Sequence, residues 1–140
     1  MNLPIDYEFD HVGIAVKSLG EGEKVYLAMG FKAGHTEEVP SEKVRVRMFE
    51  LGNNARIELL EATSPESPVA RFLEKRGPGI HHICLRVKDI RKSLLGLKAA
   101  NIRVINEEPI QGAGGCEVAF IHPSAAGGVL VELSQKRSSK

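Results

Sequence analysis

The chain has 140 residues, which is the size of one domain or of two very small modules that share a core. Apolar residues make up 42% and charged residues 26%, a globular balance that excludes a disordered chain, a collagen-like chain and a long coiled coil. The formal net charge is only +1, so the composition gives no support to a protein that binds nucleic acid or a membrane surface electrostatically.

Cysteine usage and the distribution of apolar residues favour the cytoplasm. No apolar run approaches the ~18 residues that a membrane span needs. The first ten residues lack the basic and apolar regions of a secretory signal. Two cysteines, Cys84 and Cys116, do not make a disulfide framework, and we expect both thiols to be reduced.

The predicted elements of the first half are a strand, a helix and three further strands. Ser18 and Glu21 have the spacing of a capping box, so a helix is expected from there to about Met29, with Gly30 ending it. A turn at residues 52–54 joins the last two strands into a hairpin. The expected strands are Phe9–Val16, Phe31–Glu38, Lys43–Leu51 and Ala55–Ala62.

The second half follows the same plan after a connecting segment. That segment contains a short helix, Val69–Lys75, and a hinge, Gly77–Gly79. Asp89 is expected to cap a helix that runs to about Ala100. The expected strands are Ile80–Val87, Ile102–Asn106, Glu117–His122 and Gly128–Ser134.

Two pairs of similar segments, in the same order in each half, indicate a duplicated module. Residues 10–19 and 81–90 each contain a His, alternating apolar residues, a Lys and a capping residue. Residues 56–59 resemble residues 130–133. We therefore expect a single α+β domain of two modules, at about 8–63 and 80–135, with 64–79 as connector and 136–140 as a tail.

The repeat places two histidines and two glutamates at equivalent positions. His11 and His82 open equivalent strands, and Glu58 and Glu132 lie in equivalent late strands between aliphatic residues. Alternation turns each glutamate to the face opposite its aliphatic neighbours, where a carboxylate is costly unless it is paired or bound to a metal. Any one of the four residues alone is more often hydrogen-bonded or exposed to solvent. Together they make four ligands for a divalent transition metal, with two octahedral positions open.

Other polar or small residues have weaker functional indications. Alternation predicts that His81 points away from His82, in a structural role. Cys84 is expected to be a small buried residue. The segment Gly112–Gly115 is either a flexible turn or a place where backbone N–H groups approach an anionic ligand. His122, at a strand end, is a candidate for lining the site.

Several motifs, in order, resemble the vicinal oxygen chelate superfamily and, within it, the methylmalonyl-CoA epimerase family. They extend from residue 10 to residue 133, nearly the whole chain. Each motif is weak alone, but the ordered set is specific. The motifs are Asp10–Val16, Ile57–Leu60, Ser67–Leu73, Gly79–Ile83, Gly112–Gly115, Phe120–Pro123 and Gly127–Leu133.

The resemblance implies a fold, a metal and a reaction. The fold is that of the glyoxalase and bleomycin-resistance proteins, in which two tandem βαβββ modules form a curved mixed sheet around a metal cup. The metal is typically Co(II), with Mn(II), Ni(II) or Zn(II) as alternatives. The reaction interconverts (2R)- and (2S)-methylmalonyl-CoA by removing the proton next to the thioester, through a metal-stabilised enolate. The family is usually homodimeric.

The resemblance also assigns roles to individual residues. His11, His82 and Glu132 match three metal ligands, and Glu58 matches the fourth, a position that is Gln in some relatives. Glu132 is also the candidate catalytic acid or base. His122, Gly114 and Gly115 are the candidate substrate-binding residues.

The second acid or base does not carry over from the family. Some members have a glutamate in the strand that corresponds to Val44–Met48, where this chain has Val46. Glu42, Glu38, Glu58 or a bound water stay open as the group that acts on the opposite face of the substrate. The candidate phosphate contacts for an acyl-CoA substrate are Lys98, Lys136, Arg45, Arg47 and Arg71.

Three alternatives share the resemblance. A lactoylglutathione lyase uses the same order of ligands, but such relatives usually carry a Pro-Asp-Gly turn where this chain has His122-Pro123 and Gly127-Gly128. An iron extradiol dioxygenase is disfavoured by the short chain. A drug-binding protein of the same fold binds its ligand without metal, and would have no need for Glu58 and Glu132 in apolar strands.

Overall fold

The computed structural model describes residues 7–32 and 34–137. The first half contains β1 (Tyr7–Ala15), α1 (Leu19–Gly22), α2 (Lys24–Ala28), β2 (Thr36–Val39), β3 (Val44–Glu50) and β4 (Arg56–Ala62). The connector contains α3 (Pro68–Arg76). The second half contains β5 (Gly79–Val87), α4 (Ile90–Ala99), β6 (Ile110–Gln111), β7 (Glu117–Ile121) and β8 (Val131–Gln135), with 3-10 turns η1 (Ala113–Gly115) and η2 (Pro123–Ala125).

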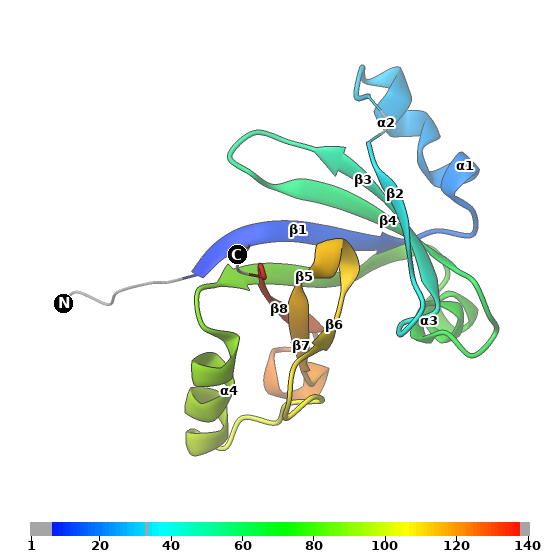
Figure 1. Cartoon of the computed structure of the whole chain (residues 1–140). Helices are drawn as coiled ribbons and strands as arrows, with labels where there is room; N and C mark the ends of the chain where they lie inside the picture. Colours follow the sequence, from blue (N-terminus) through cyan, green and yellow to red (C-terminus); the bar gives the residue numbers. More distant parts are fainter. Residues whose placement is uncertain (1–6, 33, 138–140) are drawn as a thin grey trace.

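All eight strands form one mixed sheet that curls into a half-barrel (Figure 1). Its order is β2-β3-β4-β1-β5-β8-β7-β6. In each half the first strand pairs in parallel with the last, β1 with β4 and β5 with β8. The two halves join where β1 and β5 pair antiparallel at the centre of the sheet. The predicted α+β class and curved mixed sheet are therefore confirmed.

The predicted helix caps and hairpin turn are also confirmed. The side chain of Ser18 accepts a hydrogen bond from the backbone N–H of Glu21, and that of Asp89 accepts one from Lys92. Asn53 and Asn54 adopt left-handed backbone angles in the turn between β3 and β4, which asparagine tolerates better than most residues. No described helix is long and apolar enough to cross a membrane.

The expected continuous helix after Ser18 is wrong, because α1 and α2 are separate short helices with a break at Glu23. Two glycines in α1 weaken it, since each costs about 1 kcal/mol relative to alanine inside a helix. Gly22 lies against the core, and a Cβ there would come within 2.6 Å of Val16. Close packing at this position therefore takes precedence over helix propensity.

Two predicted strands differ from the structure. Of Phe31–Glu38, only the part from Thr36 is a strand, because Phe31 packs instead on the rings of Tyr26 and Phe49; residue 33 lies outside the described residues. Of Ile102–Asn106, the structure retains a single bridge, between Val104 and Ile121.

Side-chain hydrogen bonding and turn geometry explain the remaining differences in the second half. The amide oxygen of Asn106 accepts a hydrogen bond from the backbone N–H of Phe120, in place of a regular strand contact. The two-residue strand β6 was not predicted. The last strand starts at Val131 because Gly127 and Gly128 adopt left-handed angles in the turn before it. Of the expected tail, residues 138–140 lie outside the described residues.

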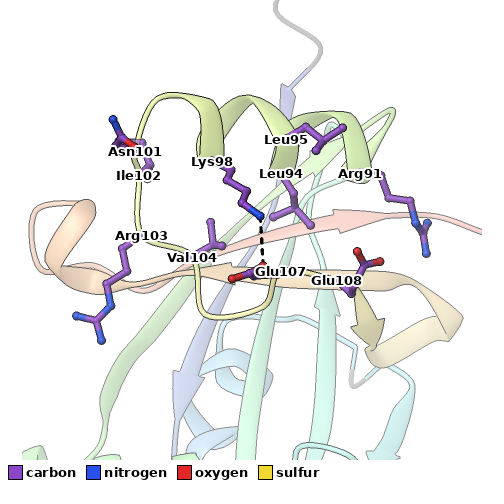
Figure 2. A pocket seen from close by; sticks show the side chains of 10 residues that line it. All are labelled: Arg91, Leu94, Leu95, Lys98, Asn101, Ile102, Arg103, Val104, Glu107 and Glu108. Carbon is purple, nitrogen blue, oxygen red and sulfur yellow. Dashed lines mark hydrogen bonds and ion pairs between the residues drawn. The ribbon is translucent and has the colours of Figure 1, made fainter.

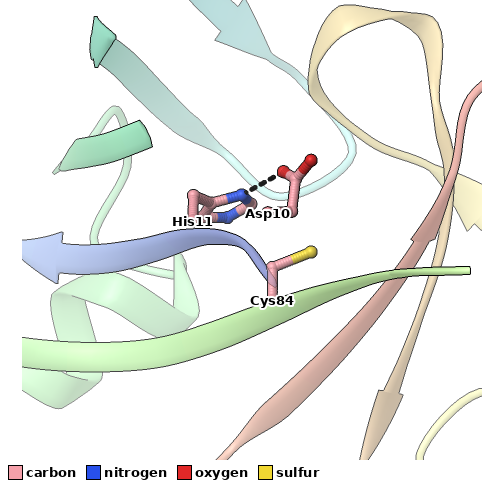
Figure 3. Close-up of side chains that lie close together, drawn as sticks. All are labelled: Asp10, His11 and Cys84. Carbon is pink, nitrogen blue, oxygen red and sulfur yellow. Dashed lines mark hydrogen bonds and ion pairs between the residues drawn. The ribbon is translucent and has the colours of Figure 1, made fainter. Parts of the chain in front are cut away.

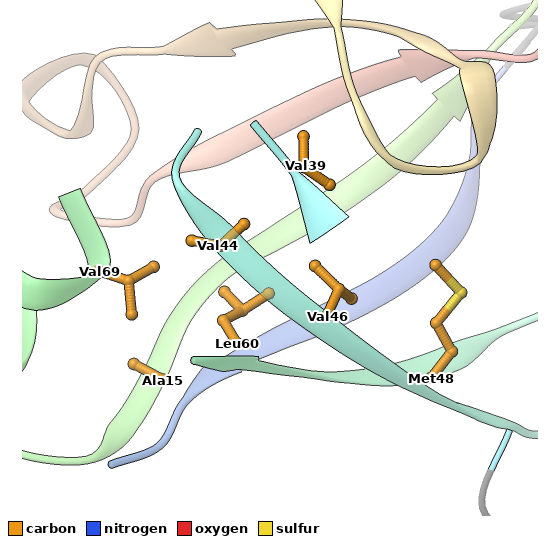
Figure 4. Packing of buried hydrophobic residues seen from close by; sticks show 7 residues of the cluster. All are labelled: Ala15, Val39, Val44, Val46, Met48, Leu60 and Val69. Atoms are coloured by element: carbon orange, nitrogen blue, oxygen red, sulfur yellow. The ribbon is translucent and has the colours of Figure 1, made fainter. Parts of the chain in front are cut away.

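The hydrophobic core divides between the two faces of the sheet. On the concave face, Val46, Leu60 and their neighbours form an apolar wall that α3 closes with Val69 (Figure 4). On the convex face, α4 covers one cluster that includes Leu133, and α1 and α2 cover another that includes Leu59. Both leucines follow a glutamate of the predicted metal set. The period of two therefore turns Glu58 and Glu132 to the concave face.

Side-chain contacts tie the two outer edges of the half-barrel together over the concave face. The carboxylate of Glu37, on β2, accepts a hydrogen bond from the backbone N–H of Gly114, at 3.0 and 3.1 Å to its two oxygens. The hydroxyl of Ser41 donates to the backbone oxygen of Gln111, on β6. The cup is consequently closed on the side opposite β1 and β5.

Replacing Ser67 by alanine tests the junction between α3 and the turn that precedes β3. The Ser67 hydroxyl, fully buried, accepts from the N–H of Val69 and donates to the backbone oxygen of Glu42. We expect Ser67→Ala to lower the free energy of unfolding by about 1–2 kcal/mol in urea denaturation, because it removes a helix cap and a buried hydrogen bond. Ser64→Ala is the matched control, whose hydroxyl accepts one hydrogen bond from Glu66 in an exposed turn. Equal losses in the two variants would contradict the assigned role.

Candidate metal centre

Three donor atoms from three strands converge at the base of the cup. The Nε2 atoms of His11, on β1, and His82, on β5, lie 3.0 Å apart. The Oε1 atom of Glu132, on β8, lies 3.3 Å from the first and 3.0 Å from the second. All three residues are buried, with 5–8% of their surface exposed. The tertiary structure thus brings together three of the four predicted ligands.

The register of the central strands produces this convergence. In the β1–β5 pairing, His11 lies opposite Cys84 and Gly13 lies opposite His82. Each imidazole therefore faces a small residue of the neighbouring strand. At Gly13 the space is filled, since a Cβ there would lie 2.2 Å from Cε1 of His82. The parallel β5–β8 pairing then sets Glu132 beside Cys84.

The residue that precedes each histidine contacts its Nδ1 atom. A register shift in β1 next to Asp10 brings the carboxylate of Asp10 to 2.7 Å from Nδ1 of His11 (Figure 3). At the equivalent place in β5, Nδ1 of His81 lies 3.0 Å from Nδ1 of His82. Both contacts leave the Nε2 atoms of His11 and His82 directed at the other donor atoms of the cluster.

Asp10 is a positioning residue that the sequence analysis missed. Its carboxylate also accepts hydrogen bonds from Arg56 and Arg86, at 2.7 and 2.9 Å. Burial raises the pKa of Asp10, but His11 and the two arginines outweigh this effect and lower it to about 2. The sequence carried a clue, since Asp10 occupies the position in the repeat that His81 occupies in the second half.

The donor set fits a divalent transition metal. The carboxylate of Asp10 accepts a hydrogen bond from Nδ1–H of His11, so that Nε2 faces the other donor atoms and presents its lone pair once a metal displaces its proton. Two ring nitrogens and a carboxylate oxygen facing one another within 3.3 Å repel unless a proton or a metal cation lies among them. Two donors at right angles on one ion, each about 2.1 Å from it, lie about 3.0 Å apart, close to the separations found here.

The electrostatics of the cluster also favour positive charge at this place. Burial lowers the pKa of His11, but the hydrogen bonds to Asp10 and Glu132 outweigh it and raise the pKa to about 9. Burial raises the pKa of Glu132, but its contacts with His11 and His82 hold that pKa well below the usual range. The carboxylate is therefore ionised.

Glu58 lies beside this cluster rather than within it. Its Oε2 atom is 3.3 Å from Nδ1 of His11 and accepts a hydrogen bond from Arg56 at 2.8 Å. Among the described residues, the donor atoms of His11, His82 and Glu132 lie within 4.8 Å of one another, and Glu58 is not part of that group. Its role as the fourth ligand stays a prediction.

A cavity opens from the donor atoms toward the apolar wall of the cup. Its volume is about 60 Å³, enough for a few water molecules, and both Glu58 and Glu132 line it. Val46 belongs to its wall, as a buried apolar residue. Glu42, in the turn before β3, lines the same cavity, and burial together with the charge of Glu132 raises its pKa.

The three predicted substrate-binding residues lie away from the donor atoms. His122 caps η2, where its Nδ1 atom accepts a hydrogen bond from the backbone N–H of Ser124. Gly114 and Gly115 form the turn that Glu37 contacts, while their neighbours Gly112 and Ala113 line the cavity. The substrate-binding assignments of these residues stay predictions.

The two remaining predictions for this region have different outcomes. Cys84 is fully buried, as expected, and burial followed by the nearby carboxylates raises the pKa of its thiol far above the usual value. It also lies near Asp10 and His11, with its sulfur within 4.8 Å of a donor atom of each (Figure 3). His81 does not point away from the site, because it lines the cavity and contacts His82.

Comparison with known proteins places this site in a family. Residues 10–120 match the model of the Glyoxalase/Bleomycin resistance protein/Dioxygenase superfamily. The chain belongs to this superfamily. It is 42% identical over 129 residues to an ethylmalonyl-CoA/methylmalonyl-CoA epimerase of Cereibacter sphaeroides, which covers 90% of this chain and 96% of the relative. The predicted resemblance to the epimerases of this superfamily is thereby confirmed.

Solved structures agree with this placement. A methylmalonyl-CoA epimerase from Mycobacterium tuberculosis superposes with a TM-score of 0.92 at 33% identity, covering 99% of this chain and 94% of the other. A methylmalonyl-CoA epimerase in complex with methylmalonyl-CoA and NH4+ has a TM-score of 0.86 at 32% identity, covering 93% and 94%. The chain is therefore an enzyme of the epimerase type within the superfamily.

Substituting Gly13 tests whether the central register makes room for the His82 ring. We expect Gly13→Ala to displace that ring and to lower the free energy of unfolding by about 1–3 kcal/mol, since the added methyl group overpacks a filled site. Chemical denaturation and the histidine ring signals in NMR spectra measure the two effects. Gly20→Ala is the control, because its Cβ would meet nothing within 4 Å. Unchanged His82 signals in Gly13→Ala would contradict this account.

Proposed function

We propose that this protein interconverts the two epimers of methylmalonyl-CoA with a divalent metal ion at the His11, His82 and Glu132 cluster. The convergence of three buried donor atoms beside a cavity that Glu42 and Glu58 also line carries this proposal. The superfamily membership and the solved complex of a relative with methylmalonyl-CoA support it.

The substrate carries its reactive hydrogen between a thioester carbonyl and a carboxylate. Removing this proton leaves negative charge on the thioester oxygen, which an ion held by the cluster would stabilise as a Lewis acid. Co(II) is the ion we propose, with Mn(II), Ni(II) and Zn(II) as alternatives. The aliphatic wall that includes Val46 and Leu60 suits the methyl group of the substrate.

Inversion at the reacting carbon needs a base on one face and an acid on the other. Glu132 and Glu42 reach the same cavity from opposite halves of the chain, β8 and the turn before β3. Glu132 is ionised and is therefore available to accept a proton, while burial and the charge of Glu132 raise the pKa of Glu42 and favour its protonated form. We therefore propose these two glutamates as the acid–base pair.

The other candidates for the second acid or base have competing partners. Glu38 forms an ion pair with Arg45 at 3.1 Å on the outside of the hairpin. Glu58 is held by Arg56. Glu42 has no such pairing among the described residues, and its backbone is anchored through Ser67.

We propose that the cup widens when substrate enters. The cavity of about 60 Å³ leaves room for only a few water-sized groups, whereas the acyl group of methylmalonyl-CoA has seven non-hydrogen atoms. Since Glu37 and Ser41 tie the two edges of the sheet over this cavity, we propose that their hydrogen bonds to Gly114 and Gln111 open when substrate binds. By its resemblance to the epimerase family, we also propose that the protein forms a homodimer.

Proton exchange at C2 of methylmalonyl-CoA in deuterated water tests the function. We expect protein freed of metal by a chelator to be inactive, and added Co(II) to restore exchange together with loss of chirality, both followed by NMR. His82→Ala should not recover with metal, whereas His35→Ala should, because His35 is exposed and remote from the cluster. No exchange with Co(II), Mn(II), Ni(II) or Zn(II) would overturn the proposal, and the hemithioacetal of methylglyoxal and glutathione would then be tested as substrate.

Removing one member of the acid–base pair should separate exchange from inversion. We expect Glu42→Gln to lower the rate of epimerisation by about 10²–10⁴-fold, while the epimer whose proton faces Glu132 still exchanges that proton with solvent. Starting from each single epimer in deuterated water, NMR and chiral analysis give both rates. Glu38→Gln is the matched control and should behave as wild type. Full inversion by Glu42→Gln would contradict the assignment.

A further inference from the structure

A second hollow adjoins the metal cavity along helix α3. It has a volume of about 270 Å³ and lies between α3 and the segment that leads into β8. Pro68 and His81 line both hollows, so the two lie next to each other. Phe72, Pro123 and Leu130 give the hollow an apolar floor, and we refer to it as the α3 groove.

The charged residues of the α3 groove are all basic. Arg71, Lys75 and Arg76 line it from α3 and are exposed, and no carboxylate lines it. Within residues 7–32 and 34–137, the side chains of Arg71 and Lys75 form no hydrogen bond or ion pair. Arg76 lies over the ring of Phe72, at 5.6 Å from its centroid. The groove thus presents three positive charges that no acidic side chain neutralises.

A second group of basic residues differs in this respect. Beside α4, Arg91, Lys98 and Arg103 surround a larger groove that also contains Glu107 and Glu108 (Figure 2). There Lys98 is 3.5 Å from Glu107, and Arg91 makes two contacts of 3.1 Å with Glu117.

Two of the phosphate contacts suggested by the sequence are also already paired. Arg45 and Arg47 bind carboxylates on the outside of the first hairpin, namely Glu38, Glu61 and Glu23. A free anion would have to compete with these acidic partners. Of the suggested set, Arg71 lies in the α3 groove, next to the metal cavity.

We propose that the α3 groove binds the phosphate groups of the coenzyme A part of the substrate. This inference rests on the proposed function and specifies how the distal part of the same substrate is held. Helix α3 leads from Pro68 at the edge of the cavity to Arg76, about 12 Å farther along at ~1.5 Å per residue. The apolar floor suits the pantetheine arm, and arginine and lysine side chains bind phosphate oxygens by charge-assisted hydrogen bonds.

The position of the groove explains how binding and chemistry cooperate. Binding energy from the remote phosphates holds the flexible acyl end beside the donor atoms, which lowers the entropic cost of reaching the reactive geometry. Methylmalonyl-pantetheine, which ends before the phosphates and the adenosine of methylmalonyl-CoA, should lose this contribution. Comparing KM for methylmalonyl-CoA with KM for methylmalonyl-pantetheine is therefore a direct test.

The test compares two triple variants, each of which removes three positive charges. The first is Arg71→Gln/Lys75→Gln/Arg76→Gln in the α3 groove, and the control is Arg91→Gln/Lys92→Gln/Arg103→Gln on and beside α4. We expect the first to raise KM for methylmalonyl-CoA about tenfold or more, and to change KM for methylmalonyl-pantetheine less than twofold. The control variant should keep both values.

Three outcomes would overturn the inference. KM for methylmalonyl-CoA could stay unchanged in the α3 variant, rise equally for both thioesters, or rise equally in the control variant. Titration calorimetry with coenzyme A alone separates this inference from the proposed function. If the wild-type protein turns over neither thioester, the proposed function fails. Loss of coenzyme A binding in the α3 variant alone would still support the groove as the binding site. Unchanged coenzyme A binding in that variant would reject it.

Discussion

The antiparallel pairing of β1 with β5 is the constraint on which the rest of the structure depends. It brings equivalent strands of the two halves side by side, so that two histidines far apart in the chain meet with their Nε2 atoms 3.0 Å apart. A small residue opposite each ring, Gly13 or Cys84, gives it room. The flanking parallel strands then add Glu132 from one side and Glu58 from the other. Without this register the halves would be two separate sheets with isolated polar residues.

The cluster is polar in the middle of an aliphatic cup, and the surroundings compensate for its burial. The negative charge of Asp10 is partly neutralised by Arg56 and Arg86, and its carboxylate in turn stabilises positive charge on the His11 ring. Every buried side-chain nitrogen and oxygen in the described chain has a hydrogen-bond partner. The low dielectric that makes an unpaired charge costly also strengthens each contact with an ion or an anionic substrate.

Helix α3, which has no counterpart in the second half, connects the proposed chemistry to substrate binding. Its cap, Ser67, anchors the backbone of Glu42, and its first turn contributes Val69 to the wall of the cavity. Its exposed side carries the basic residues of the α3 groove. The nine residues of α3, together with its cap, thus support the carboxylate of Glu42, add to the apolar wall and supply the positive charge of the α3 groove. All three features adjoin the proposed substrate site.

The sequence by itself determined much of the local structure and the set of residues that are candidates for the site. Caps at Ser18 and Asp89, the turn at Asn53 and the alternation around Glu132 depend on contacts within a few residues, so their patterns were sufficient. The internal repeat pointed to His11 and His82 because duplicated strands keep equivalent residues on equivalent faces.

The tertiary structure alone decided which of these residues meet. Phe31 and Asn106 leave the predicted strands because a ring cluster and a side-chain hydrogen bond to a distant strand replace the strand contacts. Asp10 contacts His11 through a register shift that no residue pattern announces. Glu42, rather than Val46, supplies a carboxylate to the cavity because the packing of α3 positions the turn before β3. Such contacts join segments far apart in the chain, and their geometry depends on how the whole sheet curls.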